Sequence, residues 1–142
     1  MNLAKLSKDY LKRAEVRIKS AEIAYDGKYY PEVVRYAQEA VELSLKASLR
    51  SVGIEYPKEH DVGRVLRAAK ERFPFWFSQE IDSLGEISSD LASKRAPSLY
   101  GIETIGKSPS DLFDELDGRK ALSDAKQVFE IVKKLLVELR IV

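Results

Sequence analysis

Apolar side chains recur at steps of three and four through most of the chain, which is the spacing of one face of an α-helix. The clearest stripes run through residues 3–25, 34–52 and 119–140. Gly27 follows the first stripe, and Pro31 suits the first turn of the next helix. Because few residues separate these two stripes, they are expected to form an antiparallel hairpin of two long helices.

The middle of the chain predicts two shorter helices and a long excursion. A loop over residues 54–60 leads to Asp61, which can cap the third helix. Ser78 can cap a fourth helix that ends around Arg95. Residues 96–118 are rich in Pro, Gly and Ser, so they are expected to form a functional excursion or a partly mobile loop, with a short helical turn after their Ser-Pro pair.

The same pattern sets the fold class. No segment alternates apolar and polar residues as a half-buried strand would. We therefore predict an all-α protein, an up-and-down antiparallel helical bundle of about five helices, three long and two shorter. A chain of 142 residues can bury a sizeable core without disulfides, so residues 1–142 are expected to form a single domain.

Composition narrows the classes of function. The 24 Lys and Arg nearly balance the 23 Asp and Glu, so any contact with nucleic acid must be a local patch. The absence of Cys excludes disulfides, thiolate metal sites and a Cys nucleophile. The first residues hold no apolar run for a signal peptide or a membrane span, so a cytoplasmic protein is expected. Few Met, Asn and Gln beside many Lys, Arg and Glu are typical of proteins from hot environments.

The second predicted helix carries two features on different sides. One is a stripe of small residues, Ala37, Ala40, Ser44, Ala47 and Ser48. Small side chains let helix backbones approach closely, which would serve either self-association or tight packing within one chain. The other is a polar row, Gln38, Glu42 and Lys46, in which Glu42 stands favourably ahead of Lys46 for an ion pair. Such rows usually face solvent.

Two features near the middle of the chain have a structural explanation as well as a functional one. His60 is the only histidine, and structural use next to Asp61 is more common than catalysis or metal binding, for which other ligands would have to converge. The aromatic run at residues 73–77 must be covered by something. It either plugs the end of the bundle or meets another chain.

Lys94 and Arg95 close the fourth predicted helix, and Tyr100 follows five residues after Arg95. Two cations at the end of a helix can simply complement its dipole. Alternatively, the guanidinium of Arg95 can hold a phosphate in a corner where Tyr100 stacks on a base.

Four motifs carry a family resemblance: Gly27-x-Tyr29, Gln38-Glu39-Ala40-x-Glu42-x-x-x-Lys46-Ala47, His60-Asp61 and Arg95-x-x-x-x-Tyr100. Together they resemble the HEPN domain, the "higher eukaryotes and prokaryotes nucleotide-binding" family, over most of the chain. The motif in the second helix is the most specific of the four. The resemblance implies an antiparallel helical bundle that usually dimerises.

The resemblance also implies a choice of activities. Many HEPN proteins are metal-independent ribonucleases whose signature is an Arg followed four to six residues later by a His, and prokaryotic members often pair with a small nucleotidyltransferase as toxin and antitoxin. Arg95 matches the first position of that signature, but Tyr100 stands where the His would be, and no His follows His60. A phenol moves protons poorly near neutral pH, whereas the Arg can still bind phosphate.

The leading hypothesis is therefore a homodimeric HEPN-like binding module without a cofactor or metal, whose ligand is a nucleotide, an RNA or a nucleotidyltransferase partner. Its expected binding residues are Arg95, Tyr100, Lys94, Gln38, Glu42 and Lys46. The first alternative is a ribonuclease toxin in which the two copies of Arg95 meet across the dimer and stabilise the scissile phosphate, while Tyr100 or His60 assists. The second is an interaction scaffold that binds no small ligand.

Overall fold

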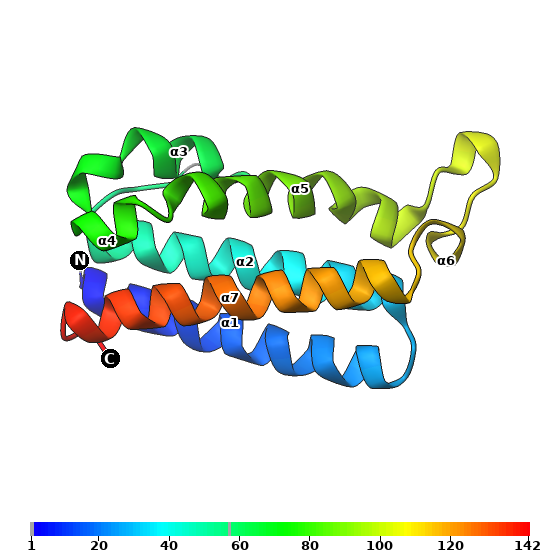
Figure 1. The fold of residues 1–142 in the computed structure, drawn as a ribbon, viewed down its shortest axis with the longest axis horizontal. Coiled ribbons are helices and arrows are strands. Elements are labelled where there is room, and N and C mark those ends of the chain that lie inside the picture. Colours follow the sequence, from blue (N-terminus) through cyan, green and yellow to red (C-terminus); the bar gives the residue numbers. More distant parts are fainter. Residues whose placement is uncertain (1, 57) are drawn as a thin grey trace.

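Four long helices form the body of the protein, which a computed structural model describes at residues 2–56 and 58–142. They are α1 (Leu3–Asp26), α2 (Tyr30–Ser51), α5 (Ile81–Tyr100) and α7 (Glu115–Glu138). Successive long helices run in opposite directions along one axis, and the two termini lie at the same end (Figure 1). The all-α, up-and-down bundle predicted from periodicity is confirmed, with four long helices in place of three.

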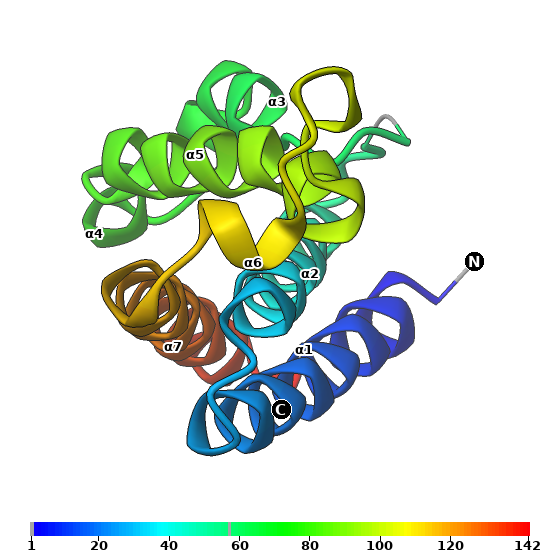
Figure 2. The ribbon, with the colours of Figure 1, turned by 90° about the vertical axis from the view of Figure 1, so that its right-hand side faces the viewer.

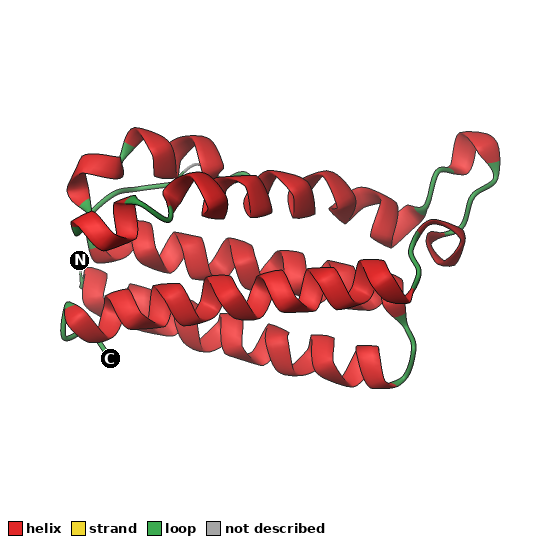
Figure 3. Ribbon diagram, in the orientation of Figure 1, coloured by secondary structure: helices red, strands yellow, loops and turns green. Residues whose placement is uncertain are grey.

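Short elements cover the two ends of the bundle. At one end lie α3 (Gly63–Ala68), a 3-10 turn (Lys70–Arg72) and α4 (Phe75–Ser78); at the other lie a 3-10 turn (Glu103–Ile105) and α6 (Pro109–Leu112). Within the described residues there is no strand, only an isolated bridge between Ile102 and Lys107 (Figure 3). In the same part of the chain, every helix is too short or too polar to cross a bilayer.

α2 is the central helix, because it packs against α1, α5 and α7 (Figure 2). Its stripe of small residues is fully buried at Ala37, Ala40, Ser44, Ala47 and Ser48. Small side chains here let the neighbouring backbones approach α2 closely. Of the two uses that the sequence left open, the stripe therefore serves packing within the chain and is not exposed for a partner.

α5 is longer than predicted. It continues through Pro97 to Tyr100, whereas the sequence placed its end around Arg95. Ser78 does not cap it, since Ser78 belongs to α4 and donates its hydroxyl to the carbonyl of Phe75. Proline removes one helical hydrogen bond, but this loss is local. Gly101 ends the helix instead, and its N–H bonds back to the carbonyl of Pro97.

The excursion predicted at residues 96–118 is correspondingly shorter, and it is well defined. It projects beyond the bundle as a tight hairpin in which Ile102 and Lys107 exchange backbone hydrogen bonds of 2.8 and 3.0 Å (Figure 1). The expected turn after Ser108 is present as α6, with a capping box between Ser108 and Asp111. A second capping box starts α7.

The aromatic run mainly plugs one end of the bundle. Phe73 and Phe77 are buried, with ring centroids 4.6 Å apart. The indole N–H of Trp76 donates to Glu138 at 2.9 Å and so joins α4 to the end of α7. Phe75, by contrast, is 76% exposed.

Candidate functional site around Arg95

Arg95 lies in the last third of α5 and reaches across to α2. Its Nη1 atom is 2.9 Å from Gln38 Oε1 and 2.9 Å from Glu39 Oε2. The side chain keeps 23% of its surface exposed. Two acceptors therefore fix the direction of the guanidinium, while one side of it stays open to a ligand.

The carboxylate of Glu39 lies within ion-pair distance of three arginines, one from each of three helices. Arg17 of α1 donates from Nε to Oε1 at 3.0 Å, and Arg35 Nη1 lies 3.6 Å from Oε2, the oxygen that also receives Arg95. One carboxylate cannot neutralise three guanidinium groups. Arg35 also pairs with Glu32 at 2.8 Å, whereas Arg17 and Arg95 share Glu39 as their counter-ion.

The polar row of α2 continues this network. Glu42 accepts from Gln38 Nε2 at 3.0 Å and from Lys46 Nζ at 2.8 Å, and His60 Nδ1 lies 2.7 Å from its Oε1. Burial alone would raise the pKa of Glu42, but the hydrogen bonds from Lys46, Gln38 and His60 together lower it below its ordinary value. Glu42 is therefore an anion at neutral pH. Gln38 links this anion to Arg95.

These groups surround a hollow of about 170 Å³, which we call the Arg95 hollow. Its lining residues are Arg13, Arg17, Glu39, Glu42, Leu43, His60 and Arg95. The lining thus includes three guanidinium groups and two carboxylates. The arrangement suits a small anion such as a phosphate, for which Arg offers a planar fork of donors.

Asp61 fixes the loop that brings His60 to the hollow. Its carboxylate accepts from the N–H of Gly63 at 2.9 Å and from the hydroxyls of Ser88 and Ser89 at 3.0 and 2.8 Å. Burial raises the pKa of Asp61, but these hydrogen bonds outweigh it and lower the pKa. Asp61 was predicted to cap α3; it does bind the N–H of Gly63, although the residue that precedes the helix is Val62.

The structure brings most of the predicted site residues together, but not all of them. Gln38, Glu42 and Lys46 are largely buried and joined to Arg95, so this row does not face solvent as such rows usually do. Lys94 pairs with Asp90 at 3.1 Å. Tyr100 is 64% exposed, and five residues along a helix turn it by about 140° from Arg95. Neither Lys94 nor Tyr100 lines the hollow.

Three residues of the site had no signal of their own in the sequence. Arg13 and Arg17 stand four apart on the flank of the apolar stripe of α1, where basic residues normally face solvent. Glu39 lies next to Gln38, within the motif of α2. Only the side-by-side packing of α1, α2 and α5 brings these three side chains to Arg95.

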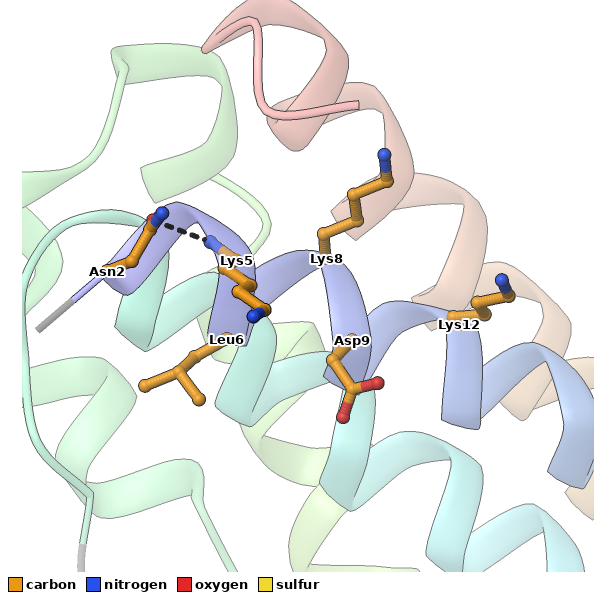
Figure 4. A pocket seen from close by; sticks show the side chains of 6 residues that line it. All are labelled: Asn2, Lys5, Leu6, Lys8, Asp9 and Lys12. Carbon is orange, nitrogen blue, oxygen red and sulfur yellow. Dashed lines mark hydrogen bonds between the residues drawn. The ribbon is translucent and has the colours of Figure 1, made fainter.

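A larger hollow, of about 610 Å³, lies along the start of α1 and has a different character. A single helix supplies its lining, from Asn2 to Lys12 (Figure 4). The side chains of Lys8 and Lys12 point to one side of the helix, while Asp9 points to the other (Figure 4). Because the polar groups diverge, we do not assign a binding site here.

Comparison with known proteins places the fold in a family. The family model described as "HEPN domain" matches residues 7–135. The chain belongs to the HEPN family. The match spans α2, α5 and most of α1 and α7, and so includes every residue that lines the Arg95 hollow.

Two individual proteins are similar to this HEPN chain, both archaeal. A protein of Methanocaldococcus jannaschii with the name "Putative toxin MJ1304" is 28% identical over 140 residues, which cover 94% of this chain and 90% of that protein. The crystal structure of ST0689, an archaeal HEPN homologue, matches with a TM-score of 0.69 over 92% of this chain and 97% of that one. Its sequence identity is 22%, so it supports the fold alone.

Proposed function

We propose that this HEPN protein is the binding module of a toxin-type pair, which acts as a homodimer and holds a phosphate of RNA or of a nucleotide in the Arg95 hollow. The observation that carries the proposal is the fixed guanidinium of Arg95, which Gln38 and Glu39 hold at 2.9 Å beside Arg13 and Arg17. Orienting a donor before the ligand arrives reduces the entropy that binding costs.

The toxin-type role is supported by the name of the Methanocaldococcus relative. By analogy with paired HEPN proteins, the second component is proposed to be a small nucleotidyltransferase. Such an enzyme, encoded beside this chain, should co-purify with it when the two are expressed together. If the neighbouring product elutes separately at every salt concentration, the two-component part of the proposal fails, while phosphate binding remains open to its own test.

Substitution of Arg95 tests the binding site. Arg95→Ala should weaken the binding of fluorescein-labelled single-stranded RNA by roughly 10- to 150-fold, the loss expected when a charged hydrogen-bond donor is removed. Lys94→Ala is the matched control, because it also removes one positive charge from α5, but from a side chain that pairs with Asp90 outside the hollow. Equal affinities of the Arg95→Ala and wild-type proteins in fluorescence anisotropy would show that the Arg95 hollow does not bind the RNA.

A specific observation favours ribonuclease activity as a second candidate function. The only histidine of the chain lies in the same hollow as Arg95, although it comes from the loop after α2 and not from the family signature. The carboxylate of Glu42 accepts a hydrogen bond from the Nδ1–H of His60, which leaves Nε2 of His60 without a hydrogen and able to accept one. That nitrogen could take a proton from a ribose 2′-hydroxyl while Arg95 stabilises the phosphate.

Cleavage assays separate the two functions. A ribonuclease of this kind should cut single-stranded RNA without added metal, and both His60→Ala and Arg95→Ala should abolish the cutting. Tyr100→Phe serves as the control, because it removes only the exposed hydroxyl of Tyr100. Binding that depends on Arg95 without any cleavage, from neutral to alkaline pH, would leave the binding module as the function.

A further inference from the structure

Two tyrosines form a ridge beside the Arg95 hollow. Tyr10 comes from α1 and Tyr56 from the loop after α2. Their ring centroids lie 5.7 Å apart at an angle of 67°, and the hydroxyl of Tyr56 donates to that of Tyr10. Both side chains are half-buried, so each ring is held by the protein while part of it remains accessible.

Cations lie against both rings. Arg13 stands 5.6 Å from the centroid of Tyr10, and Lys46 and Arg50 each stand 4.9 Å from the centroid of Tyr56. We call these five residues the tyrosine ridge. Burial and the hydrogen bond with Tyr10 raise the pKa of Tyr56 to about 12, although Arg50 acts in the opposite direction. The ridge therefore keeps a neutral phenol and a positive surface at neutral pH.

The ridge and the hollow share their residues. Arg13 lines the hollow and also lies over Tyr10. Lys46 bonds to Glu42 of the hollow and also lies over Tyr56. Arg13 follows Tyr10 by three residues and Arg17 follows Arg13 by four, so all three lie on one face of α1. Positive charge and aromatic rings therefore follow one another along the seam between α1 and α2.

We propose that the tyrosine ridge is a nucleobase-binding subsite, so that the ligand is a single-stranded nucleic acid with a phosphate in the Arg95 hollow and a neighbouring base against Tyr10 and Tyr56. This inference rests on the proposed function. A positive groove with aromatic platforms is the arrangement by which proteins hold single strands, since bases stack on rings and on Arg guanidinium planes. An acidic peptide would need the cations alone and would gain little from the rings.

Variants of Tyr56 test the ridge directly. Tyr56→Leu removes the ring and keeps an apolar side chain, whereas Tyr56→Phe is the matched control that keeps the ring and loses the hydroxyl. With a short fluorescein-labelled oligouridylate, Tyr56→Leu should lose roughly 5- to 150-fold in affinity, the usual effect of one lost base stack, and Tyr56→Phe should stay near the wild type. An oligomer of the same length with abasic ribose units should bind the wild type and both variants alike.

The other possible results distinguish failure of the tyrosine ridge from failure of the proposed function. If Tyr56→Leu binds oligouridylate as the wild type does while Arg95→Ala does not, the ridge is overturned and the proposed function survives. If Arg95→Ala binds normally, the proposed function itself fails. If Tyr56→Leu loses affinity for both the abasic oligomer and oligouridylate, its fold is damaged, and Tyr10→Leu with a native circular-dichroism spectrum becomes the deciding variant. Loss of affinity for oligouridylate alone in Tyr10→Leu supports the ridge, and any other result overturns it. Equal competition by polyglutamate would also overturn the ridge.

Discussion

The neighbours of Arg95 orient its guanidinium and also weaken its attraction for a ligand. Gln38 and Glu39 give it a direction, but Glu39 also offsets part of its charge. A phosphate that enters the hollow must therefore compete with Glu39 for the same donors. This competition makes Glu39 the residue that balances folding against ligand affinity.

Substitution of Glu39 should expose that balance. Glu39→Gln leaves Arg17, Arg35 and Arg95 without their common carboxylate, so the free energy of unfolding should fall by about 1–3 kcal/mol. Added inorganic phosphate should then raise the melting temperature of Glu39→Gln more than that of the wild type, because a ligand that binds only the folded state stabilises it. Glu32→Gln, which loses only the pair with Arg35, is the control. Equal responses of both variants to phosphate would contradict this view.

The ionisation of Glu42 predicts how stability depends on pH. The pKa of Glu42 is lowered in the folded protein from an ordinary value near 4.5, so the carboxylate stabilises the fold fully above that pH. This contribution is lost as the pH falls through the lowered value. Glu42→Gln should therefore reduce the free energy of unfolding by about 1–3 kcal/mol at neutral pH, and its difference from the wild type should shrink as the pH falls through the lowered pKa of Glu42.

Urea unfolding at a series of pH values measures this effect. Glu86→Gln is the control, since Glu86 is exposed on α5 and should change the stability at no pH. A constant difference between Glu42→Gln and the wild type across the whole range would show that the charge of Glu42 does not matter.

Sequence and structure agree at the residue scale where a side chain interacts within its own helix. Gln38, Glu42 and Lys46 are four residues apart, so their mutual contact follows from helical geometry alone. The contacts from Arg13 and Arg17 to the hollow depend on how α1 is rotated against α2, which periodicity does not determine. The lack of contact between Tyr100 and Arg95 had a simple cause, because residues five apart on a helix face different sides.

At the scale of elements, periodicity predicted α1, α2 and α7 well, and composition misled at the end of α5. Pro97 and the Ser-rich sequence around it are typical of a loop. The helix nevertheless continues, because Ser98 is buried against the bundle and Gly101 supplies the actual end. A local signal for a break was overridden by tertiary packing.

Gly101 should be essential to the hairpin that follows α5. Its φ is +68°, and an added Cβ would lie 2.0 Å from the carbonyl oxygen of Lys107. Gly101→Ala should therefore cost at least about 1–3 kcal/mol in backbone strain and speed hydrogen exchange at the N–H groups of Ile102 and Lys107.

Gly106→Ala is a close control for this substitution. Gly106 has the same φ, but its Cβ would meet nothing within 4 Å. It should cost about 1–2 kcal/mol and leave the bridge between Ile102 and Lys107 protected. Similar exchange rates at these two positions in both variants would mean that the close approach of Lys107 does not hold the hairpin.

At the scale of the whole molecule, a nearly neutral protein carries a local cluster of cations. The net charge is only +1, yet three arginines line the hollow and two more cations lie on the tyrosine ridge. The proposed binding of nucleic acid to this patch should therefore weaken steeply as the salt concentration rises. Composition predicts that any such contact is local, but the position of these cations depends on the packing of the helices, which composition does not determine.

The proposed homodimer can be tested on the intact protein. Light scattering at micromolar concentration should give a mass near twice 16.1 kDa. The buried small-residue stripe of α2 cannot supply the contact, so the interface must use other surfaces. A mass near 16.1 kDa at every concentration would reject the homodimer, while the binding tests on Arg95 would remain valid.

Trp76 gives the protein a built-in optical reporter. It is the only tryptophan of the chain, its indole is bonded to Glu138, and the ammonium of Lys134 lies 4.3 Å from its ring. Its fluorescence therefore senses whether α4 stays attached to the final turns of α7. If emission changes before far-ultraviolet circular dichroism on heating, that end of the molecule opens first, and the order of melting can be followed without any label.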